Sequence, residues 1–135
     1  MNHTKLAKNT LVLLLPLSIL AVVTVLSLMH PDKLPGRESW LARIPYADKA
    51  VHFLFYFALV SAARLARTHF GKYTPACRWR LLLFAALYGG AIELLQGAYF
   101  GRGCDIWDEA ADILGAFVAL WWVPQSWHDR FLRFF

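Results

Sequence analysis

The feature that most constrains this chain is an apolar run from Thr10 to Met29 that contains no charged residue. At about 1.5 Å per helical residue, such a run covers the roughly 30 Å hydrocarbon core of a bilayer. Two lysines precede it, as in a secretory signal peptide, but the run contains Pro16 and ends in "SLMH" without a small-residue cleavage site. The sequence therefore predicts an uncleaved first transmembrane helix.

Further apolar segments follow, and polar stretches with proline or glycine separate them. Hydrophobic residues make up 59% of the 135, above the roughly one half that is usual for a soluble domain. We therefore predict an all-α polytopic membrane protein, a bundle of four transmembrane helices with short loops in a single domain over residues 1–135. The predicted helices are 10–29, 47–63, 81–100 and 106–123.

The distribution of basic residues predicts the orientation of this bundle. Nine of the 14 Lys and Arg residues fall at the N-terminus, in the second loop or at the C-terminus. Because basic residues gather on the cytoplasmic side, both termini are predicted to be cytoplasmic. The net charge of +5 is spread in small groups beside the spans, which favours membrane lipids as partners and argues against nucleic acid.

The second apolar segment begins with an unusual polar group in "DKAVHFLFYF". Asp48, His52 and Tyr56 stand four residues apart and share one side of a helix. Asp48 could simply favour the helix start, Lys49 could reach the interface, and His52 could be a satisfied core residue. An ionisable group inside a membrane is nevertheless costly and marks a functional site by default, so all three charged residues are candidates.

The third segment, "LYGGAIELLQGAYF", places two polar residues among apolar ones. Gln96 could serve only as an interhelical hydrogen bond, and the glycines could let a second copy of the chain approach. Glu93 is harder to explain this way, because it lies seven residues before Phe100 and so about 10 Å inside the hydrocarbon edge. Glu93 and Gln96 are therefore candidate site residues, and a homo-oligomer is one prediction of the glycines.

The fourth segment follows a turn of only a few residues, so it is predicted to run antiparallel to the third. A turn centred between Arg102 and Gly103 would bring Asp112 to the depth of Glu93. Asp105, Asp108 and Asp112 share one side of the helix, while Glu109 could face that side or solvent. Favourable charges at a helix start explain Asp105 and Asp108 but not Asp112, two turns further in.

Two carboxylates at one depth in a medium of low dielectric constant cannot both be ionised at low cost. Either one of them holds a proton, or a cation lies between them. Arg102, Lys49 and protonated His52 are the cations within the chain, and a metal ion would be an external one. The sequence does not choose among these alternatives.

At these residues the chain resembles the VanZ-like family of small integral membrane proteins. The family pattern is D-K-x-x-H-F, then E-x-x-Q, then R-x-x-D-x-x-D-x-x-x-N-x-x-G. The resemblance covers residues 45–120, and the chain departs from the pattern where Asp112 replaces asparagine. The matching positions are Asp48, Lys49, His52, Phe53, Glu93, Gln96, Arg102, Asp105, Asp108 and Gly115.

The resemblance implies a multi-span protein of the bacterial inner membrane, in a family whose founding member is linked to teicoplanin resistance. It supplies no reaction. We predict that the polar cluster at the outer face binds or helps to move an envelope lipid, a lipid-linked precursor or a glycopeptide. The predicted ligand-binding residues are Asp48, Lys49, His52, Glu93, Gln96, Arg102, Asp105, Asp108 and Asp112.

Two other functions stay open at this point. His52, Glu93, Asp108 and Asp112 are suitable ligands for a metal that activates water, but no spacing typical of a metalloenzyme is present, so no metal, cofactor or catalytic residue is assigned. The polar residues could also be interhelical contacts in a scaffold or assembly protein.

Overall fold

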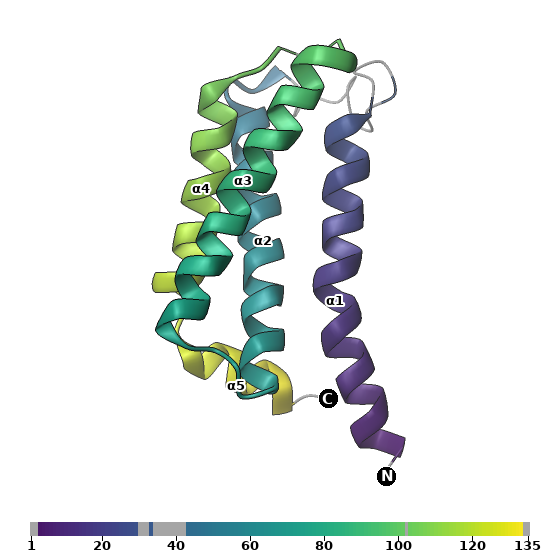
Figure 1. The fold of residues 1–135 in the computed structure, drawn as a ribbon, viewed down its shortest axis with the longest axis vertical. Coiled ribbons are helices and arrows are strands. Elements are labelled where there is room, and N and C mark those ends of the chain that lie inside the picture. The colour runs from purple at the N-terminus through teal and green to yellow at the C-terminus, as the bar shows by residue number, and fades with distance from the viewer. Residues whose placement is uncertain (1–2, 30–32, 34–42, 102, 134–135) are drawn as a thin grey trace.

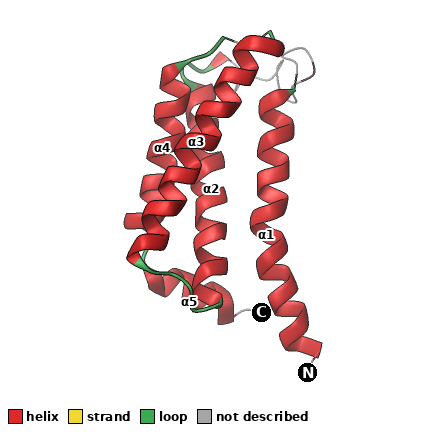
Figure 2. Ribbon diagram, viewed as in Figure 1, coloured by secondary structure: helices red, strands yellow, loops and turns green. Residues whose placement is uncertain are grey.

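The computed structural model of the chain describes residues 3–29, 33, 43–101 and 103–133. This part of the chain is helical, without a strand (Figures 1 and 2). The all-α prediction is therefore confirmed. The helices are α1 (His3–Leu28), α2 (Ala47–His69), α3 (Pro75–Tyr99), α4 (Ile106–Trp121) and α5 (Gln125–Arg133).

Three of these helices are long and apolar enough to cross a membrane, namely Lys5–Leu28, Ala47–His69 and Pro75–Tyr99. Each exposes large apolar side chains on its outer side, such as Leu17, Leu54 and Leu94. Apolar surface of this extent is typical of contact with lipid. The fourth expected span, α4, has 16 residues and is shorter.

The helices extend beyond the predicted apolar segments. α1 begins at His3, α2 continues to His69, and α3 begins at Pro75, where Thr74 accepts a hydrogen bond from the Cys77 N–H at 3.1 Å. Hydropathy marks only the part of a helix that lipid covers, whereas capping groups decide where the helix ends. The sequence analysis did not predict α5, because a short amphipathic helix adds few apolar residues to the sequence pattern.

The core of the bundle lies where α2 packs against α4, its most extensive contact. Its buried residues include several alanines, which keep the helices close: Val23, Tyr56, Val60, Ala85, Ala116, Ala119 and Leu120. A Cβ on Gly115 would collide with the carbonyl oxygen of Phe53 on α2. Glycine at this position therefore allows the two backbones to approach.

Helix α1 stands beside α2 and α3 and is held by polar contacts at several levels (Figure 1). Near its first turns, the Lys8 ammonium donates to the carbonyl of Leu132 in α5. Asn9 Oδ1 lies 2.8 Å from His69 Nε2 at the end of α2. Further along, Thr24 Oγ1 lies 2.5 Å from the Tyr88 hydroxyl of α3.

At the end of the bundle that holds the start of α1 and α5, the side chain of Arg64 on α2 bonds to the end of α4. Its guanidinium donates to the carbonyl oxygens of Ala119 and Val123, each at 2.8 Å, and to Gln125 Oε1 at 3.3 Å. The last carbonyls of a helix have no partner within the helix. The buried Arg64 supplies one here and so fixes the C-terminus of α4.

Candidate functional site

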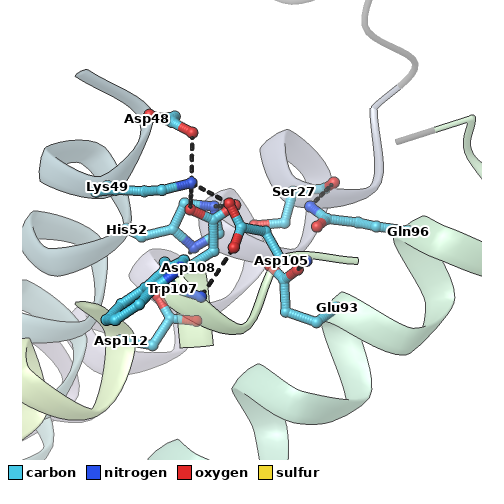
Figure 3. A network of polar contacts seen from close by, with 10 residues as sticks. All are labelled: Ser27, Asp48, Lys49, His52, Glu93, Gln96, Asp105, Trp107, Asp108 and Asp112. Atoms are coloured by element: carbon cyan, nitrogen blue, oxygen red, sulfur yellow. Dashed lines mark hydrogen bonds and ion pairs between the residues drawn. The ribbon is translucent and has the colours of Figure 1, made fainter. Parts of the chain in front are cut away.

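The opposite end of the bundle gathers the acidic and basic side chains that the sequence singled out (Figure 3). They come from three helices, because α2 and α4 begin at this end and α3 finishes there. We call these residues the polar cluster: Asp48, Lys49 and His52 from α2, Glu93 from α3, and Asp105, Asp108 and Asp112 at the start and along one side of α4.

Lys49 is the centre of the outer half of the polar cluster. Its ammonium lies 2.9 Å from Asp48 Oδ2 and 2.7 Å from Asp108 Oδ1, and it also pairs with Asp105. A lysine has three N–H donors, so three carboxylates can use them all. Lys49 therefore joins the first turn of α2 to the start of α4 rather than extending into the surroundings.

Asp105 has a second role as the N-cap of α4. Its Oδ1 accepts a hydrogen bond from the Trp107 N–H at 2.9 Å, which satisfies one of the free donors at the helix start. The hydrogen bond from Lys49, and then the one from Trp107, hold the pKa of Asp105 below its usual value. The interpretation of Asp105 as a helix-start acid is thus confirmed alongside its place in the polar cluster.

His52 is the centre of the inner half. Its Nδ1 lies 2.9 Å from Asp112 Oδ1 and its Nε2 lies 3.7 Å from Asp108 Oδ2. All three side chains are buried, Asp112 to 1% exposure. An imidazole ring with protons on both nitrogens would face one carboxylate with each, which suits a buried histidine between two acids.

Glu93 approaches the cluster from α3. Its Oε2 accepts a hydrogen bond from the backbone N–H of Asp105 at 3.1 Å, while its buried Oε1 has no hydrogen-bond partner. Glu93 therefore fixes the loop that leads into α4. One of its carboxylate oxygens also lies within 4.8 Å of ligand atoms of His52 and Asp108.

The sequence predicts that Glu93 and Asp112 lie at the same depth, and in the structure they do not. Glu93 lies beside Asp105, and Asp112 lies opposite Gly89, one helical turn from Glu93. The reason is the conformation of the chain before α4, since Asp105 is extended, at φ −119° and ψ 113°. Extended residues rise about 3.3 Å each against 1.5 Å in a helix, so α4 starts deeper than a symmetric turn predicts.

Two predicted site residues do not join the polar cluster in the described structure. Gln96 is buried and turns to α1, where its Nε2 donates to the Ser27 carbonyl oxygen at 2.6 Å (Figure 3). This is the interhelical contact that the sequence left open. Arg102 lies outside the described residues.

Sequence reasoning missed a groove beside the cluster. It has a volume of about 810 Å³ and runs between the starts of α2 and α4. One end carries charged groups and the other follows the small and apolar side of α4. Its lining residues are Tyr46, Asp48, Lys49, Asp105, Trp107, Ala110, Ala111 and Leu114. The spacing of Trp107, Ala111 and Leu114 was the available signal, but it does not differ from that of a lipid-facing stripe.

Glu109 is a further residue that the sequence analysis left undecided. The structure turns its Oε2 inward to Gly89, where it is buried. Together with the acids of the polar cluster, six carboxylates lie at this end of the bundle. Among the described residues near them, Lys49 and His52 are the basic ones. The site therefore carries excess negative charge and favours cations and hydrogen-bond donors.

The sequence analysis assigned no metal, yet the structure brings metal-type ligands together. Ligand atoms of His52, Glu93 and Asp108 lie within 4.8 Å of one another, and all three residues are buried. One nitrogen and two carboxylates from three helices form a set that a divalent transition metal accepts. A second acidic set, Asp48, Asp105 and Asp108, surrounds the Lys49 ammonium.

Comparison of the chain with protein-family models, with curated proteins and with solved structures found no match.

Proposed function

We propose that this chain is a VanZ-like, four-span protein of the bacterial inner membrane with both termini in the cytoplasm. The three long apolar helices support the first three spans. For the fourth we propose α4, which packs against both α2 and α3. The basic residues at the α1 and α5 end favour the cytoplasm for that end, and the polar cluster then lies at the outer face.

In this arrangement the function is to bind an envelope lipid. The observation that carries the proposal is the groove between α2 and α4, because its two ends match the two parts of a lipid. Charged groups from Asp48, Lys49 and Asp105 line one end, and Ala110, Ala111 and Leu114 continue it along α4. A head group would occupy the charged end, and an acyl or prenyl chain would lie against α4.

The charges at that end indicate which head group fits. Lys49 already pairs with three carboxylates, so among the described residues lining this end an incoming phosphate would meet acids and no cation without a carboxylate partner. Hydroxyl groups, in contrast, can donate to the remaining lone pairs of the Asp48 and Asp105 carboxylates without displacing Lys49. The proposed ligand is therefore a lipid with a hydroxyl-rich head group, such as a lipid-linked saccharide precursor of the envelope.

Lipid that co-purifies with the protein tests this proposal. Leu114→Trp narrows the apolar part of the groove, and Leu94→Trp is the matched control on α3, since both leucines are exposed, at 55% and 69%. Mass spectrometry of the retained lipids should find a saccharide lipid on the parent and on Leu94→Trp. Leu114→Trp should retain roughly tenfold less, which is the effect of about 1.4 kcal/mol of binding free energy. Equal retention by both variants would contradict the proposal.

The resemblance to the VanZ-like family adds a proposed consequence in cells. Binding of an envelope precursor or of the glycopeptide itself would change sensitivity to teicoplanin. Cells that carry the parent chain or Leu94→Trp should then tolerate more teicoplanin than cells that carry Leu114→Trp at the same protein level. If cells with the parent, Leu94→Trp and Leu114→Trp all tolerated the same amount of teicoplanin, lipid binding would have no effect on teicoplanin tolerance.

A second candidate function rests on His52, Glu93 and Asp108. A metal ion held by these residues would activate water against an ester or amide of a bound lipid. Metal analysis of the purified parent and of Glu93→Gln tests it. One ion per chain in the parent and none in the variant would favour the hydrolase, and the absence of any bound ion from the parent would remove it.

A further inference from the structure

A second group of polar atoms converges below the polar cluster, at Gly89 of α3. A Cβ built on Gly89 would lie 2.6 Å from Glu109 Oε2, 2.9 Å from Asp112 Oδ2 and 3.3 Å from the Tyr56 hydroxyl. The three oxygens come from α2 and α4 and meet at the backbone of α3. Only glycine leaves the space in which they gather.

Among the residues that the structure describes, none of these three oxygens has a hydrogen-bond partner, although all are buried. Asp112 uses its Oδ1 for His52, and it is Oδ2 that faces Gly89. The Tyr56 hydroxyl could donate to either carboxylate but bonds to neither. Buried polar atoms are normally satisfied, so three unsatisfied oxygens at one point indicate a ligand that bonds to all of them. Tyr56 and Asp112 are both 1% exposed, so this ligand would be enclosed.

The charged groups around these oxygens determine whether that ligand is a cation or an anion. From α2 the site faces His52, which is shared with Asp112, and from α3 it faces Tyr88 and Glu93. From α4 it faces Asp108, Glu109 and Asp112. The Tyr88 hydroxyl is hydrogen-bonded to Thr24, and the Lys49 ammonium is paired with Asp108 and the other acids of the polar cluster around it. In the described structure no basic group pairs with Glu109, so the ligand is positively charged.

We propose that Tyr56, Glu109 and Asp112 form a binding site for a hard cation, separate from the groove and from the His52, Glu93 and Asp108 set. Carboxylate and hydroxyl oxygens are the donors that ions such as Na⁺, Mg²⁺ and Ca²⁺ accept. Asp112 is the link between the two levels. Its Oδ2 contacts the cation while its Oδ1 holds His52, so occupation of the site orients His52 in the polar cluster.

Thermal unfolding of the purified full chain tests the proposal. Choline chloride serves as the reference salt, and NaCl, MgCl₂ and CaCl₂ are compared with it at equal ionic strength. At a concentration about ten times its dissociation constant, at least one of the three cations should stabilise the parent by about 1.4 kcal/mol and so raise its midpoint by about 5 °C. Radiolabelled sodium or calcium should bind to the same protein.

The variants locate the cation. Glu109→Gln removes one carboxylate with little change in shape and should abolish both the shift and the radiolabel. Asp129→Asn on α5, at the opposite end of the bundle, is the matched control and should keep both. Glu93→Gln changes the neighbouring metal-type set and tells the two sites apart. Gly89→Ala, which places a methyl group between the oxygens, should also abolish binding, but the conclusion rests on Glu109→Gln if Gly89→Ala fails to fold.

Three outcomes would overturn the site. One is a parent midpoint that no cation raises above choline, as expected if the carboxylates share a proton or a water. Another is the same shift in Glu109→Gln as in the parent. The third is loss of the shift in Glu93→Gln with retention in Glu109→Gln, which would assign the cation to His52, Glu93 and Asp108.

Discussion

His52 and Asp112 join α2 to α4 through a 2.9 Å contact between Nδ1 and Oδ1, and both side chains are buried. Asp112 is also the position at which the pattern of the proposed VanZ-like family has asparagine. Asparagine carries the same acceptor oxygen, so it can keep the contact if the ring donates. The pair is therefore compatible with either residue, and the extra charge of Asp112 has a separate consequence.

We predict that Asp112→Asn folds nearly as well as the parent, because its amide oxygen still accepts from His52. Asp112→Leu leaves the ring nitrogen buried without a partner and should cost about 1 to 3 kcal/mol in the free energy of unfolding. Protein yield and thermal midpoint of the two variants measure this. If Asp112→Asn were as unstable as Asp112→Leu, the charge rather than the hydrogen bond would hold the helices together.

Two substitutions at Asp105 distinguish its role as the N-cap of α4 from its ion pair with Lys49. Asp105→Asn keeps an N-cap oxygen for the Trp107 N–H and loses the ion pair with Lys49, whereas Asp105→Ala loses both. We expect Asp105→Ala to be less stable than Asp105→Asn by about 1 kcal/mol. Hydrogen exchange of the first turn of α4 should rise in the alanine variant alone, and equal exchange in both would contradict the capping role.

Arg64 should be essential for the far end of α4. Its side chain is 5% exposed and supplies three hydrogen bonds there. Arg64→Met keeps an unbranched apolar side chain in place of the arginine stem but leaves the carbonyls unpaired, for an expected loss of about 2 to 3 kcal/mol. Arg64→Lys should restore only part of this, because an ammonium lacks the planar fork.

The exposed Arg80 provides the matched control for that prediction. Arg80→Met removes a positive charge from the same end of the bundle without removing buried hydrogen bonds. The free energy of unfolding of Arg80→Met should differ from that of the parent by no more than an ordinary surface change, about 0.5 kcal/mol. A loss as large as that of Arg64→Met would assign the effect to membrane orientation instead.

Gly115→Ala should separate α2 from α4, because its Cβ would meet the Phe53 carbonyl oxygen, a backbone atom that cannot turn away. Overpacking of this kind costs about 1 to 3 kcal/mol. Gly90→Ala is the control, since the nearest atom to its Cβ would be 4.0 Å away. The alanine at position 90 should be neutral or slightly stabilising, as in other open helix positions. Similar midpoints for the two variants would contradict the close approach at Gly115.

Docking of α5 should depend on pH through His128. Burial lowers the pKa of His128, and the positive charge of Arg64 lowers it further. The packed helix therefore favours the neutral ring, so its stability is complete above the ordinary pKa of about 6.5 and is lost as the pH falls from there through the folded pKa. The protection factors of the α5 amides, which correct for the intrinsic pH dependence of exchange, should fall from pH 7.5 to pH 5 in the parent and stay level in His128→Gln.

The apolar pattern predicted the all-α class and the three long helices, because lipid accepts only long helices whose backbone is paired within the segment. The sequence pattern also predicted that one end of the bundle would hold a group of polar residues, because their spacing places them on one side of each helix. These residues are Asp48, Lys49, His52, Glu93, Asp105, Asp108 and Asp112. The ends of α1 and α3 were predicted less well, since polar turns outside the apolar segment still form helix.

What the sequence could not supply are the relations between helices. The axial position of α4 depends on the extended backbone at Asp105, and a shift of one turn changes which residue faces Glu93. The same shift turns Glu109 toward Gly89 rather than toward lipid. Arg64 was counted only as a basic residue that marks the cytoplasmic side, because its buried partners are backbone carbonyls, which have no signature in a sequence.

The contacts of α1 also bear on how this bundle assembles. A leucine-rich helix in lipid can slide along its neighbours at little cost, because one apolar contact replaces another. Thr24 with Tyr88, Gln96 with the Ser27 carbonyl, and Asn9 with His69 lie at separate depths, and only one axial position satisfies them all. Helix α1 can therefore enter the bilayer first, move freely along its own axis, and be locked in place when the later helices arrive.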